Sequence, residues 1–94
     1  MYQQDHNAES FENRENVEIH LRAIDLDRAR TGWAAVLPSI SDSRTKLQID
    51  AIIDLEELKG KTIVTGDVTL VWVVKDDGKK SLSKVILREI TSAQ

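Results

Sequence analysis

The sequence predicts a small domain made mainly of antiparallel β-sheet, in the all-β or the α+β class, with four or five strands and at most one short helix near residues 27–37. Three observations lead to this class. Residues 62–74 form the most apolar and most β-branched run of the chain, as expected of a central strand. Asp77 and Gly78, a pair typical of tight β-hairpin turns, follow closely. Other segments alternate apolar and polar residues, the pattern of half-buried strands.

The chain is expected to divide into a flexible N-terminal arm, residues 1–16, and a single β-rich domain, residues 17–94. The arm is rich in Gln, Asn, Asp and Glu, and its only sizeable apolar side chains are Tyr2 and Phe11. Burial of so few apolar groups does not offset the entropy lost on ordering the segment. The alternative is an arm that docks on a neighbouring subunit through these two aromatic residues.

Residues 17–22 alternate cleanly between apolar and polar, which predicts a half-buried strand. The phase of the alternation slips by one residue at Ala23 and Ile24, so we expect a β-bulge near this point. A helix is the alternative for this segment, because Ile19, Ala23 and Leu26 also have helical spacing.

The segment 27–37 is compatible with two structures. A short helix ending before Pro38 is predicted by the spacing of four apolar residues: Trp33, Val36, Leu37 and Ile40. A strand over residues 32–37 is the alternative, because Gly32 weakens the helix. Residues 41–45 are predicted to form a loop.

The C-terminal half is predicted to contain three strands, residues 46–55, 62–74 and 81–90, joined by short links into an antiparallel meander. A two-residue turn at Asp77 and Gly78 sets the register of the last two strands. It pairs Leu70 with Val85, Val68 with Leu87, Val73 with Leu82 and Asp67 with Arg88. Apolar residues then face apolar residues and an acid faces a base, which supports this register.

Composition limits the classes of function. A chain of 94 residues forms one domain and is too small for a deep catalytic cleft of its own. It contains no cysteine, which excludes disulfides and thiolate sites and favours a reducing compartment, so we predict a cytoplasmic location. The first residues do not resemble a signal peptide, and no apolar run is long enough to span a membrane.

No catalytic, cofactor-binding or metal-binding site is predicted, and a non-enzymatic role is favoured. The only histidines are His6 and His20, too few for a typical zinc site. Asp50 and Asp54 share one face of a predicted strand but are separated by more than about 10 Å, too far to share a proton. A small enzyme with a site shared between subunits is the third hypothesis.

The predicted hairpin carries the main cluster of basic residues, Lys75, Lys79, Lys80 and Lys84. A small β-barrel that binds nucleic acid through this lysine-rich tip is therefore the alternative function. Two features argue against it. The formal net charge is −3, and Asp76 and Asp77 lie among the lysines.

The leading hypothesis is a binding or assembly module that self-associates through its sheet. Both faces of the predicted hairpin are apolar, and a chain of this size has few other elements to cover them. A second copy of the chain is the simplest cover, and another protein is a further possible partner. The predicted interface residues are Trp33, Val71, Trp72, Val73, Leu82 and Ile86. The alternative is a closed barrel in which the N-terminal half of the domain covers the sheet.

Overall fold

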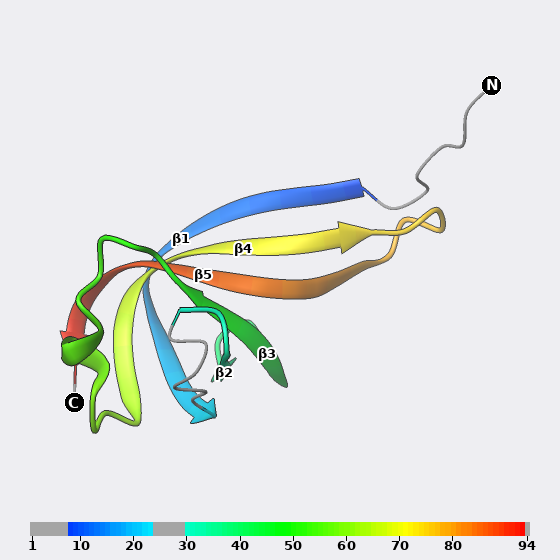
Figure 1. Cartoon of the computed structure of the whole chain (residues 1–94). Helices are drawn as coiled ribbons and strands as arrows, with labels where there is room; N and C mark the ends of the chain where they lie inside the picture. Colours follow the sequence, from blue (N-terminus) through cyan, green and yellow to red (C-terminus); the bar gives the residue numbers. More distant parts are fainter. Residues whose placement is uncertain (1–7, 24–29, 94) are drawn as a thin grey trace.

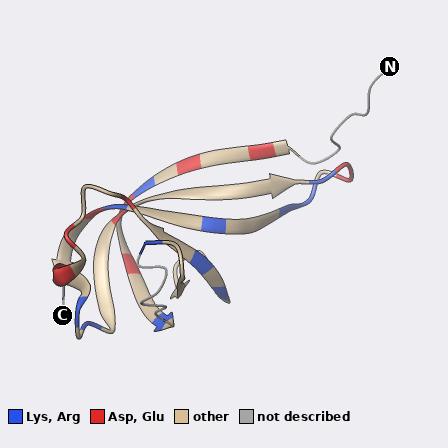
Figure 2. Ribbon diagram, in the orientation of Figure 1, with Lys and Arg blue, Asp and Glu red and all other residues tan. Residues whose placement is uncertain are grey.

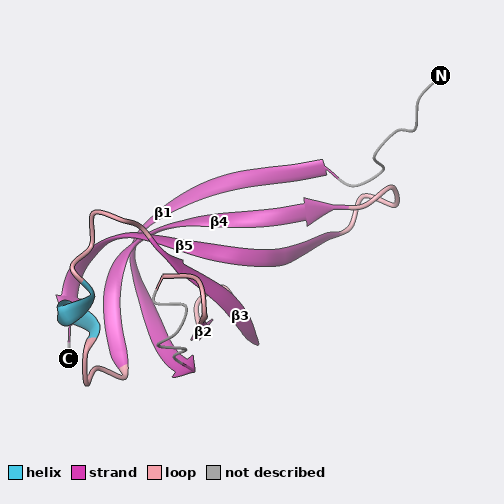
Figure 3. Cartoon of the chain, viewed as in Figure 1, coloured by secondary structure: helices cyan, strands magenta, loops and turns pink. Residues whose placement is uncertain are grey.

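The computed structural model describes residues 8–23 and 30–93 and has five β-strands that close into a barrel (Figures 1 and 3). The strands are β1 (Ala8–Ala23), β2 (Trp33–Leu37), β3 (Ser41–Ile49), β4 (Ile63–Val74) and β5 (Lys80–Ala93). A single turn of 3₁₀ helix, Leu55–Leu58, is the helical element of the described residues. The all-β prediction is confirmed, and the closed barrel is the observed architecture.

The barrel closes in the order β1-β2-β3-β5-β4, and all its pairs are antiparallel except β3 with β5, which is parallel. The predicted C-terminal meander is therefore wrong, because β3 pairs with β2 and β5 and not with β4. Residues 50–62, which include the 3₁₀ helix, carry the chain across the barrel between β3 and β4. Parallel pairing requires a crossover of this kind, and the closed sheet buries the inward face of every strand.

The strand alternative for β2 is confirmed, and the helix is wrong for Trp33–Leu37. Trp33, Ala35 and Leu37 point into the barrel and are buried. Every second side chain is therefore buried, which is the pattern of a strand and not of a helix. The predicted strand at residues 17–22 is confirmed as part of β1, with a register shift between Leu21 and Ala23. Residues 24–29 lie outside the described residues.

The predicted bounds of β3 are wrong at both ends. Residues 41–45, expected to be a loop, belong to β3 and pair with β2 although their side chains are polar. The strand ends at Ile49 instead of Leu55, because side chains of the two following aspartates accept hydrogen bonds from the backbone and form turns. Asp50 accepts from the backbone N–H of Ile52 at 3.0 Å, and Asp54 caps the 3₁₀ helix.

The side chain of Arg30 ties the chain before β2 to the turn that follows β3. Its Nη1 donates to the carbonyl oxygens of Asp50, at 2.8 Å, and Ile53, at 2.9 Å. The backbone N–H of Ile49 donates to the carbonyl of Arg30 at 2.7 Å. These bonds hold the crossover against the end of the barrel.

The β4–β5 hairpin is confirmed, but its turn is longer than predicted. The backbone N–H of Lys75 donates to the Lys79 carbonyl at 2.9 Å, and the N–H of Gly78 donates to the Lys75 carbonyl at 2.8 Å. Gly78 has a φ of 83°, as expected of the glycine that follows a turn through Asp76 and Asp77 in a three-residue hairpin loop. Gly78 thus lies in the turn as predicted, but the turn has three residues instead of two.

The predicted register of this hairpin is correct in its centre and wrong at its ends. Leu70 pairs with Val85 and Val68 with Leu87, as expected. Beyond these rows, register shifts interrupt the pairing, and each shift is a β-bulge that adds one residue to β5. The observed pairs are therefore Val73 with Ser81, Trp72 with Leu82 and Asp67 with Glu89.

The core fills the barrel with side chains from all five strands and from Leu58 of the 3₁₀ helix. β4 and β5 approach each other closely at Gly66. A Cβ atom at this position would lie only 2.3 Å from the carbonyl oxygen of Glu89. A side chain at residue 66 would therefore force the two strands apart, which is why glycine is required at this bend of the barrel.

Residues 8–16, expected to belong to the flexible arm, lie in β1, and most of them pair with β4. A bulge between Arg14 and Val17 includes Asn16, which has a φ of 53° and whose N–H donates to Asp67 Oδ1 at 3.0 Å. Composition did not reveal this strand because its partner is 50 residues or more away. Residues 1–7 lie outside the described residues.

Residues 8–14 of β1, 68–74 of β4 and 80–87 of β5 form a three-stranded sheet that we call the β-extension (Figure 1). Its inner end is part of the barrel, since residues 84–87 also pair with β3, and its outer end, residues 8–10, 72–74 and 80–82, continues beyond the barrel. It makes the molecule elongated, with principal extents of 50 × 28 × 21 Å. Its inner face continues the barrel interior, and its outer face is the opposite side of the same strands.

Leu70 is fully buried in the centre of the core, so its truncation tests the packing of β4. Leu70→Ala is expected to lower the free energy of unfolding by about 2 to 5 kcal/mol, through lost methyl burial and the cavity left behind. Chemical denaturation measures this change. Ile52→Ala is the matched control, since Ile52 is 81 % exposed, and it is expected to change stability by less than about 0.5 kcal/mol. A loss below about 1 kcal/mol for Leu70→Ala would contradict the central position of β4.

Candidate functional site on the β-extension and the β3–β5 face

The six residues predicted as an interface do not form one surface. Trp33 is 6 % exposed and belongs to the core of the barrel. Trp72 and Leu82 pair with each other on the inner face of the β-extension and pack against the core, because the bulge after Val71 turns Leu82 inward. Val71, Val73 and Ile86 remain on the outer face.

The outer face presents a row of cross-strand neighbours that spans all five strands. In the order of the sheet, the row is Phe11, Val71, Lys84, Lys46 and Ala34. Val71 is only 1 % exposed although it lies on the face opposite the core, and Phe11 and Lys84 flank it. Phe11 itself is 63 % exposed. The row thus has an exposed aromatic ring at its β1 end and two ammonium groups near its centre.

Phe11 was missed as an interface residue on the folded domain, because sequence analysis placed it in a flexible arm. Its neighbours at Glu9 and Asn13 are polar, so no alternating apolar pattern marks the strand. Only the pairing of Phe11 with Val71 shows that the ring lies on the sheet.

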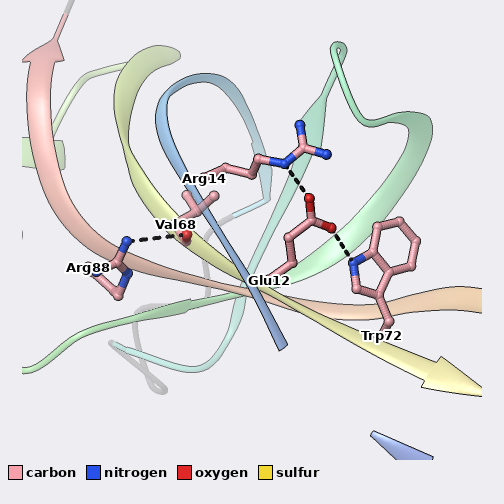
Figure 4. Close-up of polar contacts among 5 residues, drawn as sticks. All are labelled: Glu12, Arg14, Val68, Trp72 and Arg88. Carbon is pink, nitrogen blue, oxygen red and sulfur yellow. Dashed lines mark hydrogen bonds and ion pairs between the residues drawn. The ribbon is translucent and has the colours of Figure 1, made fainter. Parts of the chain in front are cut away.

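On the inner face, side-chain contacts of Glu12 with Arg14 and Trp72 join β1 to β4 (Figure 4). Trp72 Nε1 donates to Glu12 Oε1 at 3.1 Å, and Arg14 Nε donates to Glu12 Oε2. The Lys80 ammonium lies 5.7 Å from the centre of the Trp72 ring, within the range of a cation–π contact. The Arg14 hydrogen bond, and to a lesser degree that of Trp72, lowers the pKa of Glu12 below its ordinary value of 4.5. These contacts hold the N-terminal part of β1 on the β-extension.

The predicted lysine cluster is divided between two places. Lys75, Lys79 and Lys80 lie at or beside the hairpin turn, where Asp76 and Asp77 accompany them. Lys84 lies on the outer face beside Lys46 of β3, and its Nζ donates to Gln48 Oε1 at 3.2 Å. Figure 2 shows basic residues on both β3 and β5. Lys46 was not singled out from the sequence, since 38 positions separate it from Lys84 and only the parallel β3–β5 pairing joins them.

A pocket of about 430 Å³ opens at this lysine pair. Its lining residues are Thr31, Gly32, Trp33, Lys46, Leu47, Gln48 and Lys84. The lining includes two lysines and one side-chain amide and, among the described residues, no carboxylate. Trp33 and Leu47 belong to the core and are buried. Like charges directly opposite each other destabilise a sheet, so a bound anion would relieve the repulsion between Lys46 and Lys84.

A second pocket, of about 240 Å³, lies beside Arg88 at one of the β5 bulges. Arg88 Nη2 donates to the Val68 carbonyl at 3.5 Å, while its Nε is buried without a hydrogen-bond partner (Figure 4). Glu57 and Glu89 line the same pocket, so its charges are mixed. This arrangement favours no single class of ligand.

Residues considered for catalysis or metal binding are dispersed. His20 pairs with Glu18 on the outer side of β1, and His6 lies outside the described residues. Asp50 and Asp54 lie in turns and not on a strand, where they accept backbone hydrogen bonds. In residues 8–23 and 30–93, no three His, Cys, Asp or Glu side chains are placed to hold a metal ion.

The Glu12–Trp72 hydrogen bond gives a pH-dependent signal. Because folding lowers the pKa of Glu12, the carboxylate contact persists at pH 4.5 and is lost as the pH falls through the lowered pKa. The indole N–H resonance of Trp72 in NMR spectra is expected to shift with a midpoint below pH 4.5, while that of Trp33 serves as an internal reference. Glu12→Gln should abolish the transition, and a midpoint at or above 4.5 would contradict the contact.

None of the helical structure in the described residues has the length and apolar character needed to cross a membrane. No protein-family model, curated protein or solved structure matches this chain. Its function is therefore argued from the fold and from the side chains on the outer face.

Proposed function

We propose that this protein is a non-enzymatic binding module that self-associates through its β-extension. The observation that carries the proposal is the exposed ring of Phe11 on an ordered edge strand, on the outer face of the β-extension. Val73 and Ile86, two of the residues predicted as interface, are partly exposed on the same outer face. A cytoplasmic location stays a prediction from the sequence.

Closure of the barrel covers one face of the hairpin and leaves the other face available for self-association. Barrel closure covers the inner face of the hairpin, so a second copy is not needed there. The outer face of the β-extension keeps apolar side chains that no other described element covers. A two- or three-stranded sheet in water depends on packing of such a face, and burying one Phe side chain contributes about 1.5 to 3 kcal/mol. Aromatic residues of this kind are common energetic centres of interfaces.

Self-association is tested by sedimentation velocity of the unmodified chain at concentrations from about 1 μM to about 100 μM. We expect a species heavier than the 10.6 kDa protomer that dissociates on dilution. Phe11→Glu is expected to shift the equilibrium to the monomer without loss of folding, because the side chain is exposed. Ile52→Glu, which places the same charge at another exposed apolar site, is the control and should associate normally. A clean monomer at every concentration would overturn the proposal.

The lysine pair favours a second candidate function, binding of single-stranded nucleic acid on the β3–β5 face. Lys46 and Lys84 provide charge for a phosphate on this face. OB-folds, which are also small five-stranded barrels, bind oligonucleotides on the face of their second and third strands. The pocket lies against β2, β3 and the residues before β2. This likeness of architecture supports the candidate only by analogy.

This second candidate is tested by fluorescence anisotropy with a labelled single-stranded oligonucleotide over a range of salt concentrations. Lys46→Glu and Lys84→Glu are each expected to weaken binding and to reduce the slope of log affinity against log salt by about 0.7. Lys79→Glu tests the hairpin tip in the same way, and Lys59→Glu, at the end of the 3₁₀ helix and outside the pocket lining, is the control. Equal loss from all four variants would show non-specific attraction, and loss from Lys79→Glu alone would place the site at the tip.

A further inference from the structure

The β1 strand leaves a sheet edge unpaired. It pairs with β4 from Ala8 to His20, but on its other side it pairs with β2 only from His20 to Ala23. Residues 8–14 therefore form seven regular positions with no neighbour on one side among the described residues. They contain no proline or lysine, two residues that natural edge strands use to prevent pairing, and their charged residues are Glu9, Glu12 and Arg14. A partner strand must therefore match these three charges.

Resting on the proposed self-association, we propose that two copies of this chain pair through this edge, antiparallel, with Phe11 facing Phe11 of the second copy. The two β-extensions then form one continuous six-stranded sheet. A second copy can occupy this edge through a symmetric antiparallel pair only if the strand is complementary to itself. We choose a second copy as the occupant because residues 8–14 meet this condition.

The sequence of the edge meets this requirement in one register. A two-fold axis perpendicular to the sheet at Phe11 places Glu9 opposite Asn13, Ser10 opposite Glu12 and Ala8 opposite Arg14. No like charges face each other, and all seven positions are used. An axis at Glu12 would place two carboxylates face to face, and an axis at Ser10 would leave Asn13 and Arg14 without partners in the described strand.

This register also accounts for the exposure of Phe11. Directly opposed side chains in an antiparallel pair have Cβ atoms about 4.5 to 5.5 Å apart, so the two Phe11 rings meet on the outer face. Each ring lies next to Val71 of its own copy, which extends the apolar strip across the junction. Glu12 faces the other side of the sheet, where Arg14 and Trp72 already satisfy it. The pairing thus buries the exposed aromatic ring without burying an unpaired charge.

The absence of cysteine from the chain makes single-cysteine crosslinking a direct test. Glu9→Cys and Asn13→Cys keep Phe11 intact and place one thiol each at positions that face each other only between copies. Mixed together under mild oxidation, the two variants are expected to form a disulfide heterodimer, with at least a tenfold excess over the homodimers that either variant forms alone. Phe11→Cys alone should form a homodimer, and Ile52→Cys, exposed elsewhere, is the control that should not.

The outcomes separate this pairing from self-association itself. A monomer in sedimentation would overturn both. An oligomer that forms without the Glu9–Asn13 crosslink would overturn the β1 edge pairing and leave self-association through another surface. Homodimers of Glu9→Cys alone would show another antiparallel register or parallel strands, and either would also overturn it. The expected heterodimer, together with crosslinking of Phe11→Cys above the Ile52→Cys background, supports the antiparallel pair.

Discussion

The parallel pairing of β3 with β5 is the constraint on which the rest of this structure depends. It places Leu47 beside Val85 and Ile49 beside Leu87, and these four side chains belong to the core. Without this pairing the sheet would remain open, and the inward face of the hairpin would be exposed to water. The same pairing places Lys46 beside Lys84 on the outside, so one backbone contact organises both the core and the basic pocket.

The second main feature of the molecule is the β-extension, which forms because three strands are longer than barrel closure requires. β4 and β5 continue past the barrel and carry residues 8–14 of β1 with them. The bulges in β5 and the close approach of β4 and β5 at Gly66 allow these long strands to curve around the barrel. Past the barrel, the same strands continue as a sheet. The inner face of that sheet is secured by Glu12, Trp72 and Lys80, whereas its outer face and its β1 edge have no cover in the described residues.

The two proposed activities use different parts of one outer surface. Phe11 lies at the β1 edge, and the lysine pair lies on β5 and β3, with Val71 between them. Figure 2 shows the corresponding charges, with acidic residues along β1 and basic residues on β3 and β5. Edge pairing at β1 leaves the lysine pocket open. A sheet continued across two copies would therefore present a basic pocket on each side of the junction.

Local alternation and turn chemistry were enough to predict the β class, the β4–β5 hairpin with Gly78 in its turn, and the central pairs Leu70–Val85 and Val68–Leu87. Only the tertiary structure decided the β3–β5 closure, the strand at residues 8–16 and the division of the lysines. These features depend on backbone pairing between segments that are distant in the sequence. Polar side chains such as those of residues 8–16 give no pattern from which this pairing could be predicted. The bulges also escaped prediction, since inserting one residue changes which side chain faces the core without changing composition.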